Sequence, residues 1–123
     1  MSLLTKKEAT RQRILDTASK IIRRDGFDAL GVADVMKQAG LTHGGFYAHF
    51  PNRDALVAEA LGHAQRSGAD TMAISIMQQL EKGVQGVAAY IDVYLSEFHL
   101  EAYRQGDGCP IAALGCEFLR QND

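Results

Sequence analysis

Residues 32–50 read VADVMKQAGLTHGGFYAHF, and this stretch is the most informative part of the sequence about the fold. Apolar residues recur at helical spacing up to Gly40, which predicts a short helix over 32–39. Gly40 favours a sharp turn, because glycine readily adopts positive φ. Thr42 then suits the N-cap of a second, very short helix that ends before Pro51. Two short helices joined by a glycine turn are the pattern of a helix-turn-helix.

The second short helix is expected to pack on the first through Leu41 and Phe46, which have the spacing of a hydrophobic staple. This packing leaves an outward face made of Thr42, His43, Gly44, Gly45, Tyr47 and His49. Hydroxyls and basic side chains can donate to phosphates, and a side chain in the first turn can reach base edges. Two glycines destabilise a short helix by about 1 kcal/mol each. Close approach of the helix backbone to base pairs would account for this cost. A helical corner that binds nothing is the alternative interpretation.

The rest of the chain also shows helical spacing, so we expect an all-α protein. Thr5 and Glu8 match a capping box at the start of the first helix, and Asn52 suits the N-cap of the fourth. The helices expected outside the central turn lie at about 6–24, 53–80, 83–103 and 110–120. Gly62 and Gly68 argue against an unbroken helix over 53–80, because glycine weakens helix interiors.

The net charge of −2 is unevenly divided along the sequence. Residues 1–53 carry nine Lys and Arg against five Asp and Glu, hence +4, whereas residues 54–123 carry four against ten, hence −6. Such an asymmetry is typical of a polyanion-binding end joined to a different part. A solvated basic face would give the same count.

Several classes of protein are not expected. No apolar run approaches the roughly 20 residues of a membrane span, no signal peptide is evident, and two cysteines make no disulfide framework. These features predict a protein of the reducing cytoplasm that does not contact membranes. No Walker loop, dinucleotide fingerprint or catalytic triad spacing is present, so we expect neither an enzyme nor a cofactor.

Two pairs of residues could bind metal or undergo redox chemistry, but a purely structural role is expected for each. Cys109 and Cys116 are seven apart, which places them roughly 10 Å apart along a helix, too far for a disulfide. They are expected to be small buried hydrophobic residues, with redox sensing as the alternative. Glu59 and His63 share a helix face but are too few for a metal site, so a solvated pair is expected.

A second group of residues could line a pliable apolar pocket between helices. This group comprises Met72, Met77, Tyr90, Tyr94, Phe98 and His99. Ordinary core packing is the alternative interpretation of the same apolar stripe.

The stretch from about Arg11 to Leu61 resembles the DNA-binding domain of TetR/AcrR-family transcriptional regulators. The matching blocks are RILDTA at 13–18, Gly26-Phe27, VADV at 32–35, AGLT at 39–42 and GFYAHFPNRDAL at 45–56. Their order and spacing agree with the family throughout, which is far more specific than the turn alone. GCPIAAL at 108–114 also resembles the start of the sixth helix in some members.

The resemblance implies a three-helix, homeodomain-like head at residues 1–51 and a helical regulatory domain at 52–123. It further implies a homodimer on a palindromic operator, usually a repressor released by a small-molecule effector. The family's regulatory domain normally continues beyond Asp123, so this one is expected to be incomplete. Carried over by position, the phosphate contacts are Thr42, Tyr47, His49, Arg53 and the amides near Gly31 and Val32, while His43, Gly44 and Gly45 face bases.

One residue departs from the family pattern. Met36 stands where the family usually has a small residue at the closest approach of the two short helices. A larger side chain there could change the angle between them. The alternative function is therefore a helical ligand-binding or protein-interaction module without DNA binding.

Overall fold

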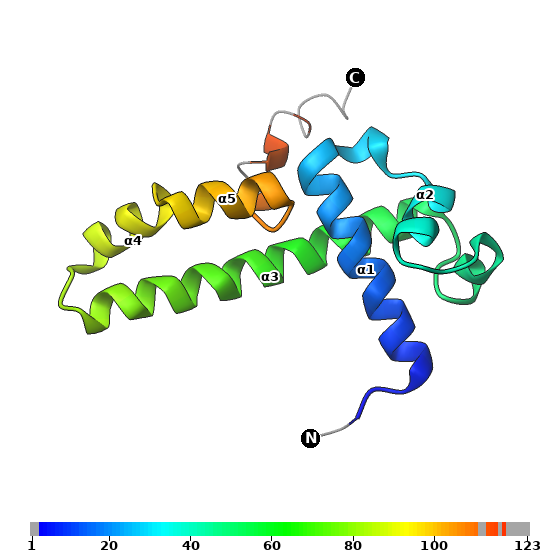
Figure 1. Ribbon diagram of the computed structural model, residues 1–123, viewed down its shortest axis with the longest axis horizontal. Helices are drawn as coiled ribbons and strands as arrows, with labels where there is room; N and C mark the ends of the chain where they lie inside the picture. Colours follow the sequence, from blue (N-terminus) through cyan, green and yellow to red (C-terminus); the bar gives the residue numbers. More distant parts are fainter. Residues whose placement is uncertain (1–2, 111–112, 116, 118–123) are drawn as a thin grey trace.

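The computed structural model describes residues 3–110, 113–115 and 117. Within these residues the regular elements are α1 (Lys6–Asp25), η1 (Phe27–Ala29), α2 (Val32–Gln38), η2 (His43–Ala48), α3 (Arg53–Glu81), α4 (Gly86–Tyr94) and α5 (Glu97–Gln105), where η marks a 3₁₀-helix. The long α3 runs the length of the molecule, with α1 and α2 near its start and α4 and α5 along its second half (Figure 1). The all-α expectation is confirmed.

Helix α1 begins at the predicted capping box. The hydroxyl of Thr5 accepts from the backbone N–H of Glu8 at 3.2 Å, and the Glu8 carboxylate accepts from the backbone N–H of Thr5 at 2.7 Å. This backbone hydrogen bond lowers the pKa of Glu8 below its ordinary value, because it stabilises the carboxylate. The buried face of α1 then supplies much of the core, including Ile14, Ala18 and Ile22.

The turn after α2 has the hydrogen bonds of a Schellman motif. Gly40 has φ +72°, its N–H donates to Lys37 O at 3.0 Å, and the N–H of Leu41 donates to Met36 O at 2.8 Å. The positive φ explains why glycine is needed here. The helix-turn-helix therefore has the turn that its sequence predicts.

The second short helix differs from a short α-helix, because η2 is a 3₁₀-helix. Its bonds span three residues, as from Gly45 N to Thr42 O at 3.2 Å and from His49 N to Phe46 O at 2.9 Å. Thr42 occupies the N-cap position, yet its side chain makes no capping hydrogen bond. Two glycines in a six-residue segment weaken the α-helical alternative, and short 3₁₀ pieces are common as connectors.

Met36 is fully buried between α2 and η2. A Cβ placed on Gly45 would lie 3.7 Å from Met36 Cε, so the methionine reaches toward η2 at its glycine. The larger side chain is thus accommodated inside the core of the head. The effect of Met36 on the angle between the helices stays a prediction.

Helix α3 is continuous over its 29 residues and agrees with the helix expected over 53–80, although Gly62 and Gly68 argued against an unbroken one. Asn52 caps it as predicted, its side chain accepting from Ala55 N at 2.8 Å. A Cβ on Gly68 would lie 3.3 Å from Pro110 Cδ, so this glycine lets a later segment approach α3 closely. Packing against that segment offsets the low helix propensity of glycine.

The single helix expected over 83–103 is wrong, because the chain breaks into α4 and α5 around Leu95 and Ser96. The Ser96 hydroxyl accepts from His99 N at 3.1 Å and donates to Val93 O at 2.7 Å. The Ser96 side chain thus caps the N-terminus of α5 and donates to a carbonyl near the C-terminus of α4. Serine at an N-cap was the available sequence signal for this break.

Two side-chain pairs join α1 to α3. Arg11 Nη2 lies 2.5 Å from Glu59 Oε2, and Asp16 Oδ1 lies 2.5 Å from His63 Nε2. Glu59 and His63 thus each pair with a residue of α1, while Glu59 stays exposed and His63 is half-buried. Among the described residues no cluster of three or more metal-ligating side chains is found.

The segment after α5 returns to the head. Pro110, residues 113–115 and Glu117 are helical, and Leu114 is buried in the same core as α1, α2 and η2. The Glu117 carboxylate accepts from the backbone N–H of Phe27 at 2.8 Å. The core is thus continuous across residue 51, and the division into 1–51 and 52–123 stays a prediction. Cys116 and the expected helix end at Arg120 lie outside the described residues.

Candidate nucleic-acid interface and a neighbouring cavity

The face of η2 has polar residues outside and aromatic residues beneath. Thr42, His43 and Gly44 are exposed, and Tyr47 is 63% exposed. Phe46 lies below them and is fully buried. The predicted contact residues of this segment are therefore brought together on one accessible surface.

Tyr47 is supported by a ladder of rings. Its ring meets that of Phe46 edge to face, with centroids 5.1 Å apart, and Phe46 stacks on Phe50 at 5.7 Å. The guanidinium carbon of Arg11 lies 4.5 Å from the centre of the Phe50 ring. Such packing restricts the rotamer of an exposed phenol, which reduces the entropy lost when the hydroxyl binds a partner.

Neither glycine on this face is required by the packing of the chain. Neither Gly44 nor Gly45 has a positive φ. A Cβ on Gly44 would meet no atom of the described residues within 4 Å, and one on Gly45 would make ordinary contacts, the nearest at 3.5 Å. The space in front of Gly44 is open, so an external surface could approach its backbone.

His49 ends η2 with one ring nitrogen inside the molecule. Its Nδ1 is buried and has no hydrogen-bond partner within the described chain. A proton on Nδ1 would therefore be an unsatisfied buried donor, which is unfavourable. The other nitrogen, Nε2, is the one that suits donation to an external group.

Arg53 is engaged within the head. Its Nε donates to Leu30 O at 2.6 Å and its Nη2 to Phe27 O at 2.5 Å, so the guanidinium holds the η1 turn. The side chain is still 41% exposed. Nearby, the N–H of Gly31 donates to Ala29 O at 3.2 Å, whereas Val32 begins α2. The predicted phosphate contacts of Arg53 and Gly31 would thus compete with bonds already made.

A cavity of about 440 Å³ lies between α3, α4, α5 and the loop 107–110. Its wall includes five of the six predicted pocket residues, namely Met72, Tyr90, Tyr94, Phe98 and His99. Met77 is not among the lining residues and is 60% exposed. Five residues after Met72 correspond to about 140° of helix rotation, so Met77 faces elsewhere.

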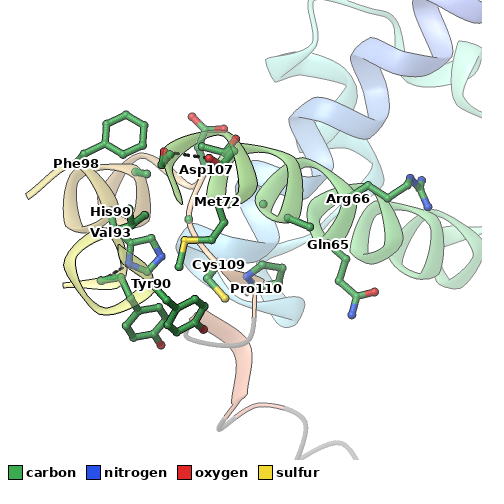
Figure 2. Close-up of a pocket in the computed structure, with 17 residues that line it drawn as sticks. Gln65, Arg66, Met72, Tyr90, Val93, Phe98, His99, Asp107, Cys109 and Pro110 are labelled. Carbon is green, nitrogen blue, oxygen red and sulfur yellow. Dashed lines mark hydrogen bonds between the residues drawn. The ribbon is translucent and has the colours of Figure 1, made fainter. Parts of the chain in front are cut away.

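The cavity is also lined by residues that the sequence analysis did not predict. The further lining residues are Gln65, Arg66, Gly68, Ala69, Thr71, Ser75, Val93, Ala102, Asp107, Gly108, Cys109 and Pro110. On α3, Gly68, Ala69 and Ser75 fall at spacings of three or four from Met72, which was a usable signal. Cys109 is half-buried in this wall, not fully buried as expected (Figure 2).

The loop 107–110 connects the cavity to α1 through Arg23. This guanidinium is only 4% exposed, and it donates to Gly108 O at 3.2 Å and Ser19 Oγ at 3.1 Å. Its Nη2 also lies 3.7 Å from Asp107 Oδ1. Burial lowers the pKa of Arg23 and the Asp107 carboxylate opposes this shift; the side chain stays charged, because arginine does not lose its proton in proteins.

No helix in the part of the chain that the structure describes has both the length and the apolarity to cross a bilayer.

Comparison with known proteins identifies relatives of this head. Residues 14–60 match the family described as bacterial regulatory proteins, tetR family. The chain is 31% identical over 117 residues to the uncharacterized HTH-type transcriptional regulator Rv0196 of Mycobacterium tuberculosis, covering 94% of this chain and 57% of that protein. The uncharacterized HTH-type transcriptional regulator YxaF of Bacillus subtilis is 26% identical over 116 residues, with 93% and 59% covered.

A third relative matches about half of the chain. The HTH-type transcriptional regulator AcrR of Shigella flexneri is 38% identical over 61 residues, which cover 48% of this chain and 28% of AcrR. The chain spans somewhat more than half the length of Rv0196 and YxaF.

Proposed function

Since the chain belongs to the TetR family of bacterial regulatory proteins, we propose that it regulates transcription in the cytoplasm by binding operator DNA through η2. The observation that carries this proposal is the outward face of η2, which combines exposed polar side chains with two glycines that the chain itself does not need. A groove of DNA would use both features, because side chains reach base edges only where the backbone approaches closely.

Each residue of the face has a proposed role. The hydroxyls of Thr42 and Tyr47 and the Nε2 of His49 donate to phosphates, which positions the head without reading sequence. His43 reads base edges from the first turn of η2. Arg53 acts mainly by holding the η1 turn, with the exposed part of its side chain near the phosphates.

The finer proposal is a homodimeric repressor on a palindromic operator. Two heads must lie about 34–36 Å apart to meet successive major grooves on one side of the duplex. A small-molecule effector in the cavity would change this spacing by favouring another position of α3 or of the loop 107–110. Support comes from α3, which reaches from the head to the cavity, and from Arg23, which bonds the loop to α1. The effector can shift the equilibrium between these two positions only by as much as its affinities for them differ.

The test is a salt titration of binding to a random-sequence duplex and to a selected operator. The logarithm of the affinity should fall with the logarithm of salt concentration by about 0.9 for each phosphate contact. Tyr47→Phe should weaken binding about fivefold on both duplexes, because one phosphate hydrogen bond is lost. Tyr103→Phe, the same change on α5, is the control and should leave the affinity unaltered.

A second candidate function is a helical ligand-binding or protein-interaction module without DNA binding. It is favoured by the engagement of Arg53 within the head. Absence of duplex binding at low salt, in protein shown to be folded, would establish this alternative and remove the first.

A further inference from the structure

The cavity contains an imidazole whose proton position is set by the chain. Nδ1 of His99 lies 2.7 Å from the carbonyl oxygen of Tyr94. A carbonyl oxygen only accepts, so Nδ1 carries the proton and donates. In the neutral imidazole Nε2 is then an acceptor. Within the described residues, Nε2 of His99 makes no hydrogen bond, and His99 lies in the cavity wall.

Several other polar groups of the wall are already engaged or point elsewhere. The hydroxyl of Thr71 donates to Ser67 O and that of Ser75 donates to Thr71 O, each at 3.0 Å. The Asp107 carboxylate lies 3.7 Å from both Lys20 and Arg23. Figure 2 shows Arg66 and Gln65 extending away from the group formed by His99, Met72 and Cys109.

The remaining wall is apolar and largely aromatic. The rings of Tyr90 and Tyr94 stack with centroids 5.9 Å apart and an interplanar angle of 13°, and Tyr94 lies 4.9 Å from the His99 ring. Met72 adds a flexible, polarizable side chain to the wall, and Phe98 adds a further aromatic ring. Flat rings pack well on such walls, whereas a charged ligand would lose hydration without gaining a partner.

We propose that the cavity takes an uncharged aromatic ligand that donates one hydrogen bond, as a phenol does, to Nε2 of His99. This inference rests on the proposed function, in which the cavity is the effector site. Its volume is within the range of sites that enclose small organic molecules. The aromatic wall supplies affinity, and His99 supplies the selection for a donor.

The test is calorimetric titration of the full chain, without DNA, with three probes of similar shape. These are 1-naphthol, which donates; 1-methoxynaphthalene, which only accepts; and 1-naphthoate, which is charged at neutral pH. We expect 1-naphthol to bind about fivefold more tightly than 1-methoxynaphthalene, the size of one hydrogen bond, and 1-naphthoate to bind least. His99→Phe keeps an aromatic ring and should abolish the preference, whereas Met77→Leu, outside the cavity, should preserve it.

A second measurement covers the case in which His99→Phe does not fold. The nitrogen NMR signal of Nε2 in the unmodified protein should shift on adding 1-naphthol and change much less with 1-methoxynaphthalene. Equal affinities for these two probes, tightest binding of 1-naphthoate, or no binding of any probe would overturn the proposal. These outcomes leave DNA binding untouched, so failure here is distinct from failure of the regulator function.

Discussion

At the scale of single residues, the glycines divide into two kinds. Gly26 and Gly106 have positive φ, and a Cβ on Gly106 would lie 2.7 Å from Lys20 O, so the fold itself requires them. Gly44 has neither property. A residue that the fold does not require, at a cost in helix propensity, indicates a contact made with another molecule.

Gly44→Ala should therefore stabilise the protein while weakening DNA binding. The added methyl group restricts the unfolded chain, which raises the free energy of unfolding by about 0.5–1 kcal/mol. The same methyl group occupies the space where the duplex approaches, so affinity should fall about tenfold, equivalent to 1.4 kcal/mol. Urea unfolding and fluorescence anisotropy with a labelled duplex measure the two effects.

Gly86→Ala is the matched control, because Gly86 also has open space before its Cβ but lies at the start of α4. It should raise stability to a similar degree and leave DNA affinity unchanged. Unaltered affinity in Gly44→Ala would mean that no groove approaches this residue.

Arg53 gives the second prediction at this scale. Arg53→Ala removes the donors to Phe27 O and Leu30 O, and should lower the free energy of unfolding by about 1–3 kcal/mol. Arg53→Lys should recover little of this loss, because an ammonium cannot reproduce the fork of a guanidinium. Chemical denaturation of the three proteins measures the effect, and a fully stable Arg53→Ala would show that these bonds are unimportant.

Local patterns made some residues predictable and left others out of reach. Thr5, Glu8 and Asn52 were predictable, since each cap depends on residues three positions away. The partners of Arg53 are backbone carbonyls 23 and 26 residues earlier, which no local pattern reveals. The phosphate contact expected for Arg53 was carried over from the family resemblance and remains a prediction.

At the scale of elements, apolar spacing left out one tertiary contact of a glycine and one local serine cap. The α3 helix continues through Gly68 because a neighbouring segment packs against that glycine. The stripe over 83–103 is broken at Ser96 because its hydroxyl caps a new helix. Apolar spacing alone carries neither piece of information, although it correctly gave the helical class and the outward face of η2.

The segment after α5 gives the prediction at this scale. Glu117 accepts from Phe27 N, and a Cβ on Gly26 would collide with its carboxylate, so the two are closely fitted. Glu117→Ala should speed amide hydrogen exchange at Phe27 by about tenfold or more, because a hydrogen bond to a charged acceptor is lost. Glu117→Gln keeps an accepting oxygen and should restore part of the protection.

Glu101→Ala is the charge-matched control for this experiment. Within the described part of the chain, its carboxylate pairs with Arg104 and Gln105 on its own helix. It should leave exchange at Phe27 unchanged. Equal protection of Phe27 in Glu117→Ala would show that the last segment does not hold the η1 turn.

At the scale of the whole molecule, one long helix connects two different surfaces. The first turns of α3 belong to the core of the basic head, and its middle forms a wall of the cavity. The charge split along the sequence, with +4 in residues 1–53 and −6 in residues 54–123, indicated that the two parts differ, and their division at residue 51 stays a prediction. It could not predict that Arg23 and Glu117 join the two parts, because both contacts cross more than 80 residues.

The most direct test of the account is a selection of bound duplexes from random DNA, carried out with the unmodified chain and with His43→Ala. The account predicts an enriched motif for the unmodified chain and a changed base preference at the position that His43 reads. Two related half-sites in that motif would also support the dimer. No enrichment above random sequence, or the same motif for both proteins, would contradict the claim that η2 reads DNA.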